Sequence, residues 1–141
     1  MLALSSQGHV LLQIGVALLL AICFEGFFVQ KLRSPRMGLS VHTLATFEAL
    51  LFLAFGLMWP TLKLTGLGAS LAFWLFVYSA FATLVPYVLA AVWGAGGSTM
   101  SLAAGSARGS DLQESAIKVV LYSAAPTGIV AFALVFWGLR G

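Results

Sequence analysis

The sequence predicts an all-helical integral membrane protein built as a four-helix bundle, and three features carry that prediction. Hydrophobic residues make up 61% of the 141 residues, and charged residues only 8%. The mean hydropathy of +1.05 is too high for a surface that faces water. The apolar residues also gather in four stretches long enough to cross a bilayer, and none has the alternating pattern of a membrane barrel strand.

We expect one domain over residues 1–141, because a helix needs about 20 apolar residues to cross about 30 Å of hydrocarbon and the chain holds four such spans. Glycine, proline, serine and charged residues bound each span, as they do at helix ends and in loops. The spans are predicted at about residues 10–28, 41–58, 68–93 and 116–139. The connection from Gly94 to Gly109 is rich in Gly, Ala and Ser and is expected to be flexible. A bundle this small is expected to oligomerise.

Particular residues refine the helix ends and interiors. Ser40 is predicted to cap the second helix, and Ser110 with Gln113 forms a capping box before the fourth. Pro86 and Pro126 lie inside spans, where each removes a backbone donor, so both are expected to kink their helices.

The few charged residues predict topology rather than nucleic-acid binding. The formal charge of +3 comes from seven scattered basic residues, with no cluster dense enough for nucleic acid. Four spans in up-and-down order place most of them at one end, namely Lys31, Arg33, Arg36, Arg108 and Lys118, against Lys63 and Arg140 at the other. The positive-inside rule then predicts both termini outside the cytoplasm, in what we expect to be a bacterial inner membrane.

Two of the four acidic residues lie inside the apolar stretches, where a charge costs roughly 2.5 to 3.5 kcal/mol. Glu25 is near the end of the first span, and pairing with Lys31 or Arg33 is its expected role. Glu48 lies about two turns into the second helix, so it must be protonated or meet a polar partner from another helix. Glu48 is therefore the stronger functional candidate.

His42 follows the predicted cap by two residues and is therefore expected in the first turn of its helix. The positive end of the helix dipole favours a neutral ring there, and neutral imidazole is the form that binds iron or zinc. An interfacial histidine without a function fits the position equally well. Glu48 follows six residues later, about 9 Å along the helix and about 120° around it, so the two side chains can border one cavity.

The third predicted helix carries Ser79, Thr83 and Tyr87 at four-residue spacing, so they share one face that is expected to look inward. Ser79 and other hydroxyls in the spans often bond their own helix or a neighbour, which is a purely structural role. The phenol of Tyr87 needs a partner at membrane depth, and a substrate can supply one.

Several short runs, taken in order, resemble a known family. They are Gly8-His9, the run Pro35-Arg36-Met37-Gly38-Leu39-Ser40 that leads to His42, Gly94-Ala95-Gly96, Ala103-Ala104-Gly105, Gln113-Glu114 and the tail Trp137-Gly138-Leu139-Arg140-Gly141. With these runs in this order, the chain resembles the hydroxylaminobenzene mutases over nearly its whole length. Styrene oxide isomerases are similar at a greater distance.

The wider resemblance implies a homotrimeric four-helix membrane isomerase, in which a histidine at the His42 position binds haem b and a tyrosine at the Tyr87 position assists. This chain departs from the family pattern at two positions, because relatives carry asparagine where it has Glu48 and Thr83. Both fall in the expected pocket, where a changed polar contact alters which substrate is accepted.

One hypothesis for the reaction follows, an intramolecular rearrangement of a small aromatic N-hydroxy or epoxide compound. Ferric haem b held by His42 would act as a Lewis acid toward the substrate oxygen, without net redox. Tyr87 would orient the substrate, and Glu48 would manage a proton or stabilise a cationic intermediate. Thr83 completes the predicted catalytic set.

Two other interpretations stay open. Small multidrug-resistance transporters also have four short helices and a glutamate in the first span, so Glu25 is a candidate for proton-coupled binding. Its position near a span end beside Lys31 argues against that role. The third interpretation is a structural membrane subunit without chemistry, in which Tyr87 and Glu48 serve packing alone.

Overall fold

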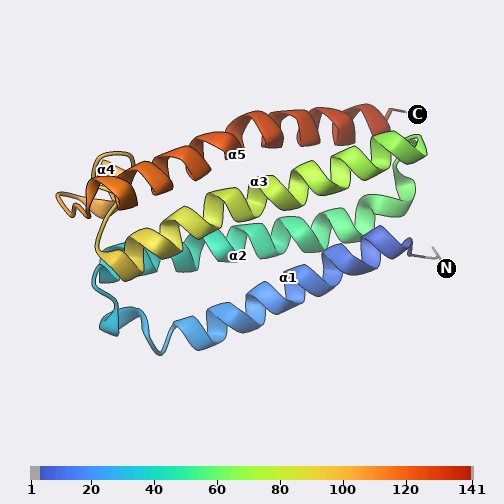
Figure 1. The fold of residues 1–141 in the computed structure, drawn as a ribbon. Helices are drawn as coiled ribbons and strands as arrows, with labels where there is room; N and C mark the ends of the chain where they lie inside the picture. The colour runs from blue at the N-terminus through green and yellow to red at the C-terminus, as the bar shows by residue number, and fades with distance from the viewer. Residues whose placement is uncertain (1–3, 141) are drawn as a thin grey trace.

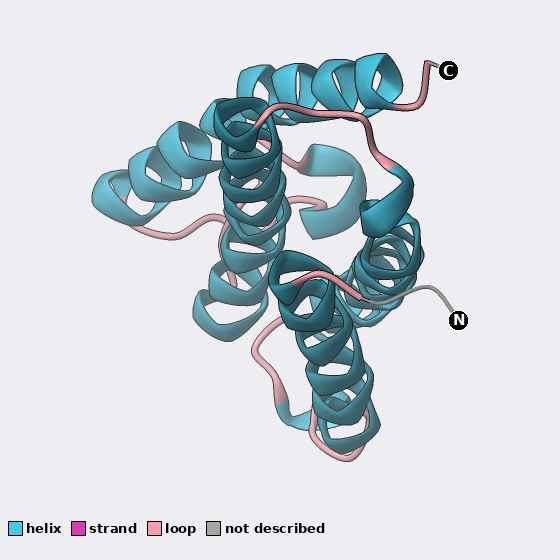
Figure 2. Ribbon diagram, turned by 90° about the vertical axis from the view of Figure 1, so that its right-hand side faces the viewer, coloured by secondary structure: helices cyan, strands magenta, loops and turns pink. Residues whose placement is uncertain are grey.

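The computed structural model describes residues 4–140, which form helices joined by short loops. Four helices are long and apolar enough to cross a membrane, which confirms the predicted fold class. They are α1 (Ser6–Glu25), α2 (Pro35–Met58), α3 (Gly66–Trp93) and α5 (Asp111–Gly138). The shorter elements are α4 (Ser101–Ala104) and the 3₁₀ turns η1 (Val29–Lys31) and η2 (Trp59–Thr61). Figure 2 shows only helices and loops in the described chain.

The long helices run up and down and pack in chain order, α1 on α2, α2 on α3 and α3 on α5 (Figure 1). The start of α1, the end of α5 and the connection between α2 and α3 lie at one end of the bundle. The connection between α1 and α2 and the segment that holds α4 lie at the opposite end. At that end Arg36 donates a hydrogen bond of 2.7 Å to the Leu102 carbonyl, so the two basic connections meet there.

The start of α2 differs from the prediction. The helix begins at Pro35, and its N-cap is Ser34, whose hydroxyl accepts from the Met37 N–H at 3.4 Å. Ser40 lies inside the helix and donates a bond of 3.2 Å to the Arg36 carbonyl, so the predicted cap at Ser40 is wrong. Proline explains the earlier start, because its fixed φ suits the first helical position.

The start of α5 agrees with the prediction. Ser110 is its N-cap, and both bonds of the capping box with Gln113 are present. Pro86 lies inside α3 and Pro126 inside α5. Figure 1 shows α5 following a gentle curve, as expected for a helix that lacks a backbone donor near its middle.

The segment between α3 and α5 is tied to α5 by a single side chain. The Glu114 carboxylate accepts from the backbone N–H groups of Gly96 at 2.8 Å and Gly109 at 2.9 Å. It also accepts from the backbone N–H of Ser98 at 3.3 Å and from the Ser98 hydroxyl. One carboxylate therefore holds both ends of the segment against the start of α5, and the expected flexibility of this connection stays a prediction.

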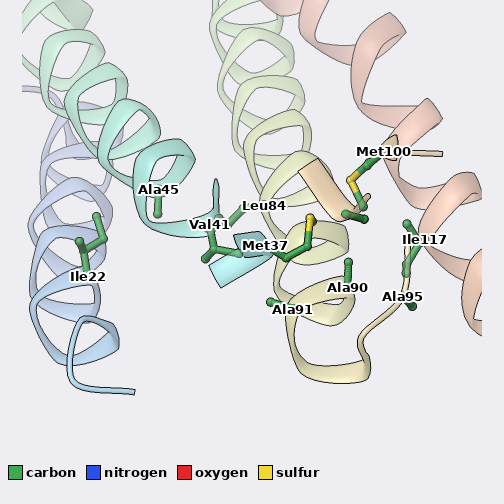
Figure 3. Close-up of a cluster of buried hydrophobic side chains, with 11 residues drawn as sticks. Ile22, Met37, Val41, Ala45, Leu84, Ala90, Ala91, Ala95, Met100 and Ile117 are labelled. Carbon is green, nitrogen blue, oxygen red and sulfur yellow. The ribbon is translucent and has the colours of Figure 1, made fainter. Parts of the chain in front are cut away.

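Two hydrophobic clusters fill the bundle, one toward each end. The cluster at the α4 end (Figure 3) consists of Ile22, Met37, Val41, Ala45, Leu84, Ala90, Ala91, Ala95, Met100, Ala104 and Ile117. The other cluster is rich in aromatic side chains, and the rings of Phe52 and Phe76 within it lie 4.8 Å apart. On α2, Glu48 lies between Ala45 of the first cluster and Phe52 of the second. It therefore marks the boundary between them.

Glycines let α1 approach α2 closely. A Cβ added at Gly56 would lie 2.7 Å from Leu12 Cγ and 3.0 Å from the Gly8 carbonyl oxygen. A Cβ added at Gly15 would lie 2.9 Å from the Leu53 side chain. Helices in membranes associate largely through such close contacts, because lipid supplies no hydrophobic force between them.

Replacing Gly56 with leucine should push α1 away from α2 and lower the free energy of unfolding by about 1–3 kcal/mol, the usual cost of overpacking. Gly66→Ala is the matched control, because a Cβ added there has no neighbour within 4 Å. Thermal unfolding in detergent, followed by circular dichroism, measures both variants. A Gly56→Leu protein as stable as wild type would contradict the close packing.

Candidate active site

The first part of the site is a pair of polar side chains between α1 and α2. His42 Nδ1 lies 2.8 Å from Glu25 Oε2. The His42 side chain is 40% exposed and that of Glu25 is 22% exposed. Glu25 is the last residue of α1 and faces α2, so its predicted pairing with Lys31 or Arg33 is wrong.

This contact engages Nδ1 of His42 and leaves Nε2 on the other side of the ring. If the Glu25 carboxylate accepts this hydrogen bond, Nδ1 carries the proton, and a neutral His42 ring then keeps a lone pair on Nε2. Histidines that bind metals commonly have such an acceptor behind the ring. Because α2 begins at Pro35, His42 lies well beyond the first turn, and the predicted influence of the helix end on its ring is wrong. Glu25 orients the ring instead.

The pair borders a hollow of about 160 Å³ whose other walls are apolar side chains of α1, α2 and α3. The second carboxylate oxygen, Glu25 Oε1, is buried without a hydrogen-bond partner among residues 4–140. Within residues 4–140, no group of three His, Cys, Asp or Glu side chains is placed to hold a metal ion. A metal beside His42 would therefore have fewer than three such ligands from the described residues, and a haem iron commonly has a single histidine.

Glu48 forms the second part of the site. The residue is 6% exposed, and its Oε2 atom has no hydrogen-bond partner in the part of the chain that the structure describes. It lines a hollow of about 270 Å³ between α2, α3 and α5, beside the rings of Phe47, Phe76 and Phe132. An unpaired buried polar group costs about 1–3 kcal/mol, so we expect a bound molecule to supply its partner.

Ser79 and Thr83 line the same hollow, so this face of α3 turns inward as predicted. The Ser79 hydroxyl donates to the Ala124 carbonyl at 2.9 Å, and the Thr83 hydroxyl donates to the Ser79 carbonyl at 2.9 Å. Both hydrogens are therefore in use, and the two oxygens offer the hollow only acceptor lone pairs.

Tyr87 lies in a neighbouring groove of about 470 Å³ near α4, together with Ser40 and Ala103. Its hydroxyl makes no hydrogen bond to the described residues. The groove shares Leu44 and Phe47 with the hollow of Glu48. Tyr87 is thus beside that hollow, across a wall of two side chains.

Within one chain, the predicted site residues fall on two sides of α2. Glu48 and Thr83 share one hollow, Tyr87 lies in the adjoining groove, and His42 lines a hollow toward α1. The expected common cavity of His42 and Glu48 is therefore not formed within the described chain. Sequence reasoning also missed the contact between His42 and Glu25. The signal for it was that two polar residues stand at the same end of adjacent antiparallel spans.

Comparison with known proteins supports an enzyme of the kind that the sequence resembles. A family model described as styrene oxide isomerase matches residues 7–140. Hydroxylaminobenzene mutase HabB of Ectopseudomonas oleovorans is 43% identical over 131 residues, which cover 92% of this chain and 79% of that protein. Hydroxylaminobenzene mutase HabA of the same organism is 32% identical over 125 residues, which cover 89% of this chain and 93% of that protein. No solved structure matches this chain. The chain therefore belongs to the styrene oxide isomerase family and is a membrane isomerase of the mutase type.

Proposed function

We propose that this protein rearranges an aromatic hydroxylamine by moving the oxygen of its N–OH group from nitrogen to a ring carbon. The N–O bond breaks, a C–O bond forms, and the proton lost from the ring carbon is returned to a heteroatom of the product. Substrate and product are then isomers, and no external oxidant or reductant is needed. The two similar mutases support this substrate class, and an epoxide is the alternative that the family name suggests.

The buried carboxyl group of Glu48 is the observation that carries this proposal. Breaking the N–O bond leaves positive charge on the nitrogen and the ring, which a carboxylate stabilises strongly in a dry site. The ring carbon that gains oxygen must also lose a proton. Glu48 Oε2 has no partner among the described residues. We assign Glu48, ionised once a bound substrate supplies that partner, as the base that takes this proton and returns it.

The walls of the hollow suit a small aromatic ring. Phe47, Phe76 and Phe132 offer ring faces and edges to an aryl group and keep water away from a reactive cation. The oxygens of Ser79 and Thr83 can accept from the substrate N–H or O–H, because their own hydrogens are already donated. A volume of about 270 Å³ favours a compound with a single ring.

Tyr87 is proposed as the donor to the substrate oxygen. Its hydroxyl has no partner in the described chain, and it lies across Leu44 and Phe47 from the hollow of Glu48. A phenol that donates to oxygen while negative charge develops there would lower the barrier to N–O cleavage.

For the cofactor we propose haem b, which the imidazole of His42 would hold. The support is the ring itself, which is partly exposed, held at Nδ1 by Glu25 and free at Nε2. When bound, ferric haem would supply a Lewis acid that polarises the N–O bond without net redox. The hollow beside His42 has a volume of about 160 Å³, below the roughly 300–1,000 Å³ of usual ligand pockets. The cofactor would therefore extend outside this hollow, where a further wall is needed to enclose it.

We propose a homotrimer in which a neighbouring chain provides that wall. His42 and Glu48 line hollows on different sides of α2, and contact between copies is one way to bring the two functions together. We further propose that the basic end of the bundle faces the cytoplasm of a bacterium and that both termini lie outside it. A proton-coupled transporter is not favoured, because Glu25 is held by His42 and the similar proteins are mutases.

The protein in lipid vesicles should convert hydroxylaminobenzene to an isomeric aminophenol without added oxidant or reductant. An isotopic label in the N–OH oxygen should stay in the product, because the transfer is intramolecular. Liquid chromatography with mass spectrometry measures both quantities. Exchange of the label with water would rule out an intramolecular transfer.

Glu48→Gln should lower kcat by about 10²–10⁴-fold, the usual contribution of a general acid or base. The amide keeps the shape of the side chain but cannot take the ring proton. Asp111→Asn is the control, because it makes the same chemical change at an exposed residue in the first turn of α5. A Glu48→Gln enzyme with wild-type kcat and unchanged Tm would remove Glu48 from the chemistry.

Purified wild type should show a Soret band, and His42→Ala should lose it. His9→Ala is the matched control, because His9 is the other histidine of the chain and lies near the start of α1. Glu25→Ala should weaken haem binding by about 10–100-fold, the range for losing a group that orients a metal ligand. A wild type without a Soret band, or a band that survives His42→Ala, would contradict haem binding at this residue.

A further inference from the structure

A wider groove lies next to the hollow that holds Glu48. It runs between α3 and α5 with a volume of about 750 Å³, and its α5 wall includes Ala125, Gly128 and Ile129. Groove and hollow have three lining residues in common, which are Ser79, Thr83 and Phe132. A molecule in the groove is therefore separated from Glu48 only by side chains that line both spaces.

The depth of the groove decides what can enter it. Its α5 residues run from Leu121 to Phe132, within a helix that spans Asp111–Gly138. At 1.5 Å per residue, this stretch stops about 15 Å short of one helix end and about 9 Å short of the other. Ala125 and Ile129 are exposed there. The groove therefore opens toward the acyl chains of the bilayer, where water is scarce.

The chemistry of the groove suits an apolar ring. The Ser79 and Thr83 hydroxyls on its wall already donate to backbone carbonyls, so they place no free donor in the path. A Cβ added at Gly128 would lie 2.6 Å from Ser79 Oγ, so this glycine is what lets the Ser79 side chain lie against α5. Apart from the hydroxyl of Tyr122, the remaining lining is apolar.

Along the axis of the bundle, one of the two hydrophobic clusters lies on each side of Glu48. A substrate that moved along this axis would have to part a packed core. The smaller groove of Tyr87 also adjoins the hollow, behind Leu44 and Phe47. Access from the side, through the bilayer, needs only the displacement of the side chains shared by groove and hollow.

We propose that this groove is the binding and access site through which an apolar aromatic substrate passes from the bilayer to Glu48. The inference rests on the proposed function, because that function requires a one-ring aromatic substrate. Because its aromatic ring partitions into the hydrocarbon of the bilayer, the substrate is more concentrated near the groove than in water. The α5 wall at Ala125 then controls how fast the substrate reaches the site.

The test compares wild type with Ala125→Trp and Ala133→Trp in lipid bilayers. Both alanines are exposed on α5, but only Ala125 lines the groove. The probe is 4-fluorotoluene, a one-ring aromatic that cannot rearrange, and fluorine NMR measures its exchange between lipid and protein. Ala125→Trp should slow this exchange by about tenfold, because the added ring fills part of the groove and a tenfold change corresponds to an energy within the usual range for overpacking. Ala133→Trp should match wild type.

Equal exchange rates in the three proteins would overturn the access groove, and so would a wild type that binds no probe. A wild type that binds no probe would mean that lipid acyl chains occupy the groove permanently. Rearrangement of hydroxylaminobenzene is measured on the same samples. If no protein rearranges hydroxylaminobenzene but the exchange rates differ as expected, the proposed function is wrong and the access groove is still supported. The two failures are therefore distinguishable.

Discussion

A carboxyl group without a partner, buried halfway along a membrane bundle, is the constraint around which this protein is arranged. Glu48 interrupts the apolar packing at the boundary between two clusters, and the space beside it remains a hollow. Replacing it with an apolar residue would remove the desolvation cost, so packing alone gives no reason to keep a carboxyl group there. In the proposed function, the aromatic walls of the hollow hold the substrate beside Glu48, and the groove leads the substrate to it.

The second polar feature, His42 with Glu25, lies toward α1 and differs from Glu48 because its two side chains are paired and partly exposed. Its ring is partly exposed, and a carboxylate fixes one nitrogen, so the other nitrogen can face outward as a ligand. Since six residues turn a helix by about 120° relative to the starting face, α2 presents His42 and Glu48 in different directions. A cofactor side and a substrate side are thus joined by one helix, and the proposed assembly of copies would bring the two together.

The rest of the bundle holds these two features in place. Close packing of α1 on α2 at Gly8, Gly15 and Gly56 fixes the distance across which Glu25 reaches His42. At the basic end, the Glu114 carboxylate ties the segment between α3 and α5 to the start of α5. That segment also supplies a wall of the groove that holds Tyr87. Stability and site geometry therefore depend on the same contacts.

The sequence by itself determined the class of fold, the number of spans, the capping box at Ser110 and the family, because hydropathy, capping and ordered motifs are local properties of the chain. It also singled out Glu48 by the cost of burying a charge. Only the tertiary structure decided that Glu25 meets His42, that His42 and Glu48 line different hollows, and that Glu114 binds both ends of the long connection. These contacts join residues on different elements, and their distances depend on helix rotation and interhelical spacing, which no local pattern encodes.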